Sequence, residues 1–200
     1  MTPVHGVGFA DGTRLLEGSI VYALVVLTDI SDADLERSTP CSEWNLRELL
    51  WHVNESMADL HEGIVTGGVE LFEVVRGATV PAPMRMAEPR GTAQVLASRL
   101  LSVVSMRGSS PSVSIGDRPL DGGVAASVGA IEVAAHAWDI SHACGHNLDV
   151  PKQLARDLLE LSHDVIPEPH RSPFFAPPVK VGPSASETDK FVAFLGRMPG

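Results

Sequence analysis

The stretch from Val124 to Ile140 is apolar except for four side chains, three of which could do chemistry together. These three are Glu132, His136 and Asp139, and the fourth is Ser127. On a helix, where successive residues are about 100° apart, His136 lies about 40° from Glu132 and Asp139 about 20° to the other side. They therefore form a polar seam along a helix that should otherwise be buried on most of its faces.

The seam has the residue types of a metal site. A buried carboxylate is costly unless it is paired or binds a metal ion. Glu132 and His136 are four residues apart, so they can direct two ligands at one cation from a single helix face. An internal Glu–His hydrogen bond, or a pair that faces a water-filled crevice, explains the same spacing without a metal. The spacing alone leaves these alternatives open.

A metal site in a helical bundle also needs a ligand from a second helix, and His52 is the candidate. It lies about 105° from the centre of the apolar stripe on the helix predicted there, at the boundary between core and solvent. Glu55, Ser56 and Asp59 lie on the same side of that helix and could support it. A lone histidine at such a boundary is more often an ordinary surface residue.

The other candidates for chemistry are weaker. Cys41 precedes a predicted helix, where a thiolate can be stabilised, but a small buried cysteine is the more common case. Cys144 lies about 80° round its helix from His136. The two cysteines could form one disulfide, but neither belongs to a C-x-x-C motif. The sequence has no glycine-rich phosphate loop, no G-x-S-x-G and no H-E-x-x-H.

Composition restricts the class of protein. The 200 residues are 44% hydrophobic and 20% charged, which favours a single globular domain over 1–200. The net charge of -10, without any run of basic residues, argues against binding to nucleic acid or to anionic membranes. The first residues lack the basic and apolar regions of a signal peptide, and the apolar stretch 20–27 is too short to span a membrane. We therefore expect a cytoplasmic protein with reduced thiols.

Hydrophobic spacing predicts the elements that must position these residues. Helices are expected over 12–28, 46–66, 92–106, 124–144, 151–165 and 186–195. Asn45 with Glu48, and Ser186 with Asp189, have the spacing of capping boxes at helix starts. The segments between helices, including 78–91 and 107–123, are expected to be loops, and the strand signals at 113–115 and 179–181 are short. The chain should be all-α, with additional short C-terminal helices and long loops.

Three motifs carry a resemblance that spans nearly the whole chain. Residues 39–53 contain TPC-x-x-W followed by LL-x-H, and residues 132–139 read E-x-x-x-H-x-W-D, followed by Ala-x-Gly. Residues 191–199 read FVAFLGRMP, similar to LAFLGR-x-P. In this order the motifs resemble an actinobacterial family of the DinB/YfiT-like superfamily, which is similar to the N-terminal domain of mycothiol-dependent maleylpyruvate isomerase.

The resemblance implies a DinB-like four-helix bundle with a metal site made by His52, Glu132 and His136, in agreement with the polar seam. It also implies a divalent ion, most often zinc or nickel, and mycothiol or a similar small thiol as the partner. The isomerase has a further C-terminal domain that contributes to its active site. The sequence ends at Gly200, so we do not expect that domain here, nor the maleylpyruvate isomerisation that depends on it.

The leading hypothesis is a metal-dependent thiol S-transferase. Three protein ligands would leave coordination positions for a substrate, and a thiol activated by the ion would attack an electrophilic small molecule. One alternative is a metal-dependent hydrolase, and another is a non-catalytic metal-binding or interaction protein of the same fold. Asp139 is expected to support a ligand or to anchor the structure. We expect a monomer or a homodimer.

Overall fold

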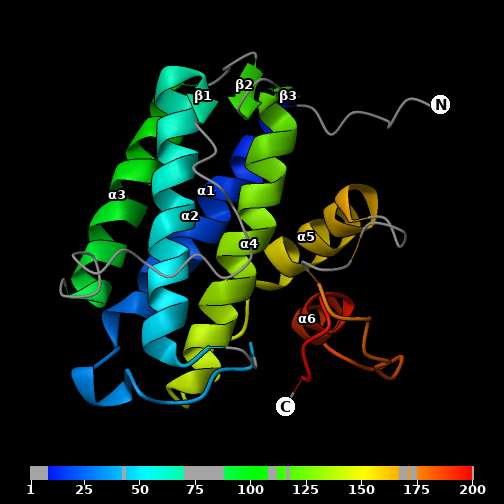
Figure 1. Cartoon of the computed structure of the whole chain (residues 1–200). Helices are drawn as coiled ribbons and strands as arrows, with labels where there is room; N and C mark the ends of the chain where they lie inside the picture. Colours follow the sequence, from blue (N-terminus) through cyan, green and yellow to red (C-terminus); the bar gives the residue numbers. More distant parts are fainter. Residues whose placement is uncertain are drawn as a thin grey trace.

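The computed structural model describes residues 9–41, 44–69, 88–107, 112–115, 118–166, 171 and 175–199. Four long helices run alongside one another within these ranges: α1 (Phe9–Thr28), α2 (Leu46–Thr66), α3 (Pro89–Arg107) and α4 (Gly122–Ala143). Two shorter helices lie at the edge of the bundle: α5 (Lys152–Val165) packs on α4, and α6 (Glu187–Phe194) packs on α5 (Figure 1). The predicted all-α helical bundle is confirmed.

The four long helices pack in the cyclic order α1, α3, α2, α4, so that α4 contacts both α1 and α2. The centre of the bundle is filled by side chains that are almost fully buried, including Leu16, Ile20, Leu49, Leu50, Met57, Leu100 and Ile131. Helix α4 is buried along nearly its whole length. Its many alanines and glycines allow this, because small side chains let neighbouring helices approach closely.

Both predicted capping boxes are present at helix starts. The Asn45 side chain accepts a hydrogen bond from the Glu48 N–H, and the Glu48 carboxylate accepts one from the Asn45 N–H at 3.0 Å. Ser186 and Asp189 make the same exchange before α6. At the other end of α2, Gly67 adopts a φ of 77°, a left-handed conformation that favours glycine and ends the helix.

Helix α3 begins at Pro89, whereas the sequence predicted a loop as far as residue 91. The Glu88 carboxylate explains the earlier start, because it accepts hydrogen bonds from the N–H groups of Arg90 and Gly91. Proline suits the first turn of a helix, where its missing N–H has no partner to lose. Residues 78–87 of the predicted loop lie outside the described residues.

The predicted loop over 107–123 instead contains two short strands. Strands β2 (Ser112–Ile115) and β3 (Arg118–Asp121) pair antiparallel, and β1 (Gly68–Val69) pairs parallel with β2. The strand signal at 113–115 therefore belongs to a real strand. The signal at 179–181 does not, since the structure has no strand there. This small sheet lies at one end of the bundle, next to the start of α4 (Figure 1).

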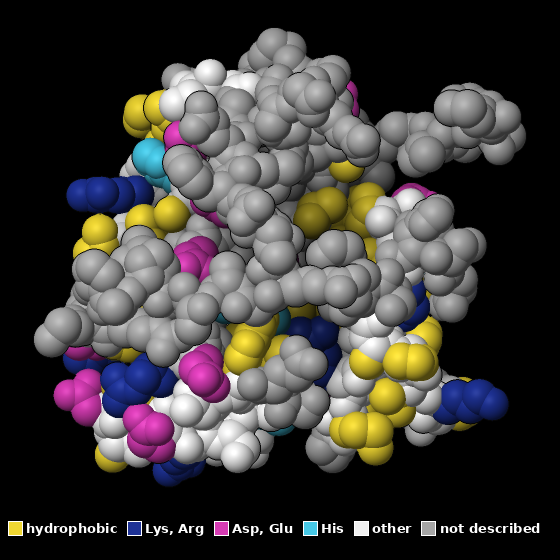
Figure 2. Space-filling view, in the orientation of Figure 1, with side chains coloured by type: hydrophobic (Ala, Val, Ile, Leu, Met, Phe, Trp, Pro, Cys, Tyr) yellow, Lys and Arg dark blue, Asp and Glu magenta, His cyan; other side chains and the backbone are white. Residues whose placement is uncertain are grey.

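Two further observations concern the helices and one face of the molecule. Among the residues that the structure describes, no helix combines the length and the apolar character needed to cross a membrane. On the face shown in Figure 2, Asp and Glu side chains are interspersed with Lys and Arg. The described part of this face therefore offers no broad basic surface of the kind that binds nucleic acid.

Candidate metal centre

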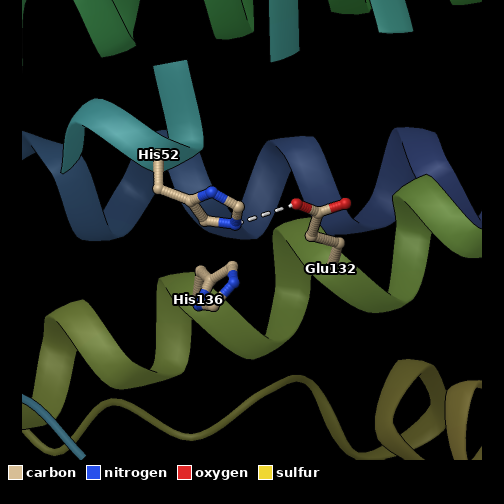
Figure 3. Close-up of side chains that lie close together, drawn as sticks. All are labelled: His52, Glu132 and His136. Atoms are coloured by element: carbon tan, nitrogen blue, oxygen red, sulfur yellow. Dashed lines mark ion pairs between the residues drawn. The ribbon is translucent and has the colours of Figure 1, made fainter. Parts of the chain in front are cut away.

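His52 from α2 and Glu132 and His136 from α4 point toward one another where the two helices pack (Figure 3). Each offers one ligand atom, and these atoms all lie within 4.8 Å of one another. The Nε2 atom of His52 is 3.2 Å from the Glu132 Oε1 atom. The structure thus brings together all three residues that the sequence proposed as ligands, from positions about eighty residues apart.

Glu132 is held as a carboxylate by its neighbours. Burial raises its pKa, but hydrogen bonding and charge from His52, the charge of His136 and a hydrogen bond from Ser56 outweigh burial and lower the pKa to about 2. The Ser56 hydroxyl donates to the same Oε1 atom that faces His52. Glu132 is therefore ionised at neutral pH, which is the state that binds cations.

His136 is oriented from behind by Asp139, one turn further along α4. The Asp139 Oδ2 atom lies 3.1 Å from His136 Nδ1. A carboxylate at Nδ1 favours the tautomer that carries its proton there, which leaves the Nε2 lone pair for a ligand. Asp139 is fully buried and is also paired with Arg197, at 2.9 Å from Nη2 to Oδ2. Burial raises the pKa of Asp139, but its contacts with His136 and Arg197 outweigh burial and lower it.

His52 is fixed by aromatic packing. Its ring lies 4.5 Å from that of Trp44, centroid to centroid, and meets the His136 ring edge-on at 5.0 Å. Trp44 also contacts the His136 ring, at 6.3 Å. Trp44 therefore restricts both imidazoles. About a third of the His52 and Glu132 side chains stays exposed, whereas only 9% of the His136 side chain does, so solvent reaches the cluster at His52 and Glu132.

Of the three polar neighbours expected to support His52, Glu55 interacts with it through charge, whereas Ser56 and Asp59 act on Glu132. Ser56 contacts Glu132 rather than the histidine. Burial, together with negative charge from Asp59, raises the pKa of Glu55 against the opposing charge of His52. Burial and the charges of Glu62 and Glu132 raise the pKa of Asp59. These carboxyl groups make this side of α2 electrically negative, which favours a cation at the cluster.

Neither cysteine is a ligand in the cluster of His52, Glu132 and His136, and the two form no disulfide. Cys144 is buried, and burial together with the charge of Asp34 raises the pKa of its thiol to about 11. Cys41 is half-buried and lies close enough to Arg197 to help raise the pKa of that guanidinium. His142, the other histidine of α4, stacks on Trp138 at 3.7 Å, away from the cluster.

Two contributors to the centre were missed in the sequence, Trp44 and Arg197. Both stand in motifs that carried the resemblance, Trp44 in TPC-x-x-W and Arg197 in FVAFLGRMP, but neither was given a role. Arg197 lies 58 residues after its partner Asp139. A signal for a partner of this kind was present, because a carboxylate on an apolar helix needs a compensating cation. Nothing in the spacing indicated which basic residue provides the positive charge that compensates Asp139.

The donor set fits a divalent transition metal. Two imidazole nitrogens and one carboxylate oxygen are ligands that zinc and similar ions accept, and three protein ligands are typical of sites that keep a position for substrate. The carboxylate behind His136 is the usual companion of a metal-binding histidine. Among the described residues, this is the group whose geometry could hold a metal ion.

The comparisons with known proteins place the three residues of the cluster within one family domain. A family model described as the mycothiol maleylpyruvate isomerase N-terminal domain matches residues 22–141, which include His52, Glu132 and His136. Two curated proteins of Mycobacterium tuberculosis, the uncharacterized proteins MT0763 of strain CDC 1551 and Rv0738 of strain H37Rv, are each 26% identical to the chain. The alignments extend over 177 residues, 86% of this chain and 90% of each relative. No solved structure matches the chain.

Proposed function

The chain belongs to the family of the mycothiol maleylpyruvate isomerase N-terminal domain, and from this membership and the geometry of the cluster we propose that it is a metal-dependent thiol S-transferase. His52, Glu132 and His136 bind one divalent ion, either zinc or nickel. The observation that carries the proposal is the approach of these three ligand atoms to within 4.8 Å of one another. When bound, such an ion supplies Lewis acidity, which lowers the pKa of a coordinated thiol or water.

The surrounding residues have distinct roles in this proposal. Ser56 keeps the Glu132 carboxylate facing His52, Asp139 orients His136, and Trp44 covers both imidazoles. The exposed sides of His52 and Glu132 are where a substrate can approach. The positions of the histidines are thus fixed before any substrate binds, which reduces the cost of ordering the site.

The thiol comes from outside the protein. The raised pKa of Cys144 keeps that thiol protonated at neutral pH, and it is not among the ligand atoms of the cluster. An external thiol, mycothiol or a similar small molecule, fits the family to which the chain belongs. Its sulfur loses a proton and forms a bond to an electrophilic carbon of a second small molecule. That carbon either releases a leaving group with its bonding electron pair or gives up one bond of a carbon–carbon double bond, whose electron pair then takes up a proton. Both substrates are expected in the cytoplasm, where small thiols are kept reduced.

The metal assignment is tested by the metal content of purified variants. Wild type should carry about one divalent ion per chain, and His52→Ala and His136→Ala should lose most of it. Each has a matched control on the same helix, His61→Ala on α2 and His142→Ala on α4, which should keep the wild-type content. Equal metal in all five proteins by elemental analysis would exclude this site.

The reaction is tested by incubating metal-loaded protein with mycothiol and a panel of electrophiles while thiol loss is followed. Wild type and Cys41→Ala should consume thiol, and His52→Ala should not. If Cys41→Ala is inactive with its metal intact, the nucleophile belongs to the protein and the proposal is wrong. If the metal is present but mycothiol does not bind at millimolar concentration, a non-catalytic metal-binding role replaces it. Water-dependent cleavage of the electrophiles without thiol loss would indicate a hydrolase.

A further inference from the structure

The C-terminal segment 175–199, which contains α6 and is called the tail below, places one arginine directly behind the candidate metal centre. Arg197 follows α6, and its guanidinium makes two contacts with the Asp139 carboxylate: Nη2 to Oδ2 at 2.9 Å and Nε to Oδ1 at 3.3 Å. Asp139 is completely buried, and the Arg197 side chain is 11% exposed. A two-point contact of this kind fixes the plane of the carboxylate as well as its charge.

The same carboxylate oxygen serves both neighbours. The Asp139 Oδ2 atom accepts from Arg197 and lies 3.1 Å from His136 Nδ1, so the arginine, the carboxylate and the imidazole form a continuous row. Without Arg197, the buried Asp139 carboxylate would be held by its contact with His136 at one oxygen, which leaves the plane of the carboxylate less restricted. With Arg197 in place, the carboxylate plane that holds the His136 ring is fixed.

We infer that Arg197 is a positioning residue for the metal ligand His136, acting through Asp139. This inference rests on the proposed metal site. It also gives the C-terminal segment a function, since Arg197 lies outside the part of the chain that the family model matches. A segment outside the bundle thereby sets how well one ligand inside the bundle binds its ion.

The backbone around Gly196 is held in a conformation that places the Arg197 side chain against Asp139. Gly196 has a φ of 88°, and a Cβ atom there would lie 2.7 Å from the Cβ of Ala176, so the turn needs glycine. The Arg197 N–H then donates to the carbonyl oxygen of Val192 at 3.0 Å, and Nη1 donates to that of Leu195 at 3.2 Å. Backbone and side chain of Arg197 are both tied to the segment that aims it at Asp139.

A purely structural role for Arg197 makes a different prediction, and Arg171 allows the two to be separated. Arg171 is also a buried arginine of the C-terminal region. Its guanidinium donates to the carbonyl oxygens of Ala176 and Phe194 and lies over the Phe194 ring at 4.6 Å. It therefore anchors the same segment without reaching Asp139 or any ligand. Loss of Arg171 should weaken the docking of the tail while leaving the row behind His136 intact.

The experiment measures the zinc affinity of wild type, Arg197→Gln, Arg197→Lys and Arg171→Gln by competition with a chromophoric chelator. Arg197→Gln should bind zinc about ten-fold more weakly, at the lower end of the loss for removing a direct partner of a metal-binding histidine, because Arg197 acts on His136 through Asp139. Arg197→Lys keeps the charge without the two-point geometry, so it should recover part of that loss. Arg171→Gln should lower the melting temperature of the metal-free protein but keep the wild-type zinc affinity.

Two further measurements make the test independent of folding defects. The absorption bands of the cobalt-substituted protein report ligand geometry directly, and they should shift in Arg197→Lys and Arg197→Gln but not in Arg171→Gln. Asp139→Asn should weaken zinc binding at least as much as Arg197→Gln, and the double variant should bind no more weakly than Asp139→Asn, because both residues act along one path. If Arg197→Gln does not fold, the lysine variant and the cobalt spectra decide.

The inference is overturned if folded Arg197 variants bind zinc as wild type does, with unchanged cobalt spectra. It is also overturned if Arg171→Gln loses as much affinity as Arg197→Gln, since the effect would then belong to the docking of the tail. Failure of the proposed metal site is a separate result, because in that case wild type itself would not bind zinc.

Discussion

The ionised state of Glu132 should make the metal-free protein sensitive to acid. Its pKa is about 2 in the folded protein, compared with an ordinary value of 4.5, because contacts with His52, His136 and Ser56 outweigh the effect of burial. A carboxyl group whose pKa is lowered by folding stabilises the protein above its unfolded pKa. That stability is lost as the pH falls toward the folded pKa.

The size of the effect follows from the two pKa values. Their difference corresponds to about 3 kcal/mol of stability in total, of which about 2 kcal/mol should be lost between pH 5 and pH 3. Since 31% of the Glu132 side chain is exposed, solvent screening makes these figures upper values. The pKa values of Asp34, Asp139 and Glu187 are lowered as well, so these groups also lose stability on acidification. The contribution of Glu132 is therefore the difference between wild type and a variant that lacks this carboxyl group.

The assay is urea unfolding of protein that has been stripped of metal beforehand, at several pH values from 5 to 3. Wild type should lose up to about 2 kcal/mol more stability over this range than Glu132→Gln, which has no carboxyl group to protonate. Glu160→Gln, at an exposed glutamate of α5, is the control and should follow wild type. Ser56→Ala should fall between wild type and Glu132→Gln. Parallel curves for wild type and Glu132→Gln would refute the account of Glu132 given above.

Three further outcomes are expected. Removing the metal should lower the melting temperature by several degrees, because an ion that binds only the folded state stabilises it; an unchanged melting curve after confirmed metal loss would contradict the site. Zinc affinity should fall on acidification from pH 7 to pH 5, since a protonated imidazole cannot bind a metal, and a pH-independent affinity would argue against histidine ligands. Gly12→Ala should destabilise the protein to urea by more than about 1 kcal/mol, because its Cβ would lie 2.6 Å from the carbonyl oxygen of Gly123. Gly129→Ala should reduce the stability to urea by less, since its Cβ would meet only the flexible end of the Leu60 side chain. A larger loss for Gly129→Ala than for Gly12→Ala would show that the contact between α1 and α4 adjusts more easily than the structure indicates.

The fold was largely predictable because its helices carry strong local signals. The capping boxes at Asn45 and Ser186 and the left-handed glycine at 67 set helix ends through contacts within a few residues, and such contacts can be read from the sequence. The start of α3 was misjudged because proline and glycine near its start were interpreted as loop signals. In the folded chain, the Glu88 carboxylate satisfies the first N–H groups and makes both residues compatible with the helix.

The small sheet was missed for a different reason. Strands β1 and β2 come from segments more than forty residues apart, and each is too short to show a clear alternation of polar and apolar side chains. Their pairing depends on how α2 and α4 bring the two segments together at one end of the bundle. Local spacing cannot show such a contact, because the information lies in the packing of the helices rather than in the strands.

The candidate site divides in the same way. The need for polar partners can be read from the sequence of α4 alone, whereas the partners themselves come from distant parts of the chain. An apolar, mostly buried α4 requires that each polar side chain on it find a partner, and the sequence identified that requirement at Glu132, His136 and Asp139. The partners come from elsewhere: His52 and Ser56 lie on α2, and Arg197 lies on the tail. The position of His52 on its predicted helix made it a candidate, but a histidine at the edge of an apolar stripe is ordinary, and the motif was needed to distinguish it from a surface residue.

The burial of α4 therefore links the stability of the protein to its proposed chemistry. A polar seam on a surface helix could be solvated, and its residues would then be free to vary in orientation. On a buried helix the same residues must be paired, and each pairing fixes a side chain: Ser56 fixes Glu132, and Arg197 fixes Asp139, which in turn fixes His136. The contacts that offset the cost of burying charge are thus the contacts that hold the ligand atoms close together. For this reason, substitutions behind the centre should alter metal affinity even where they touch no ligand.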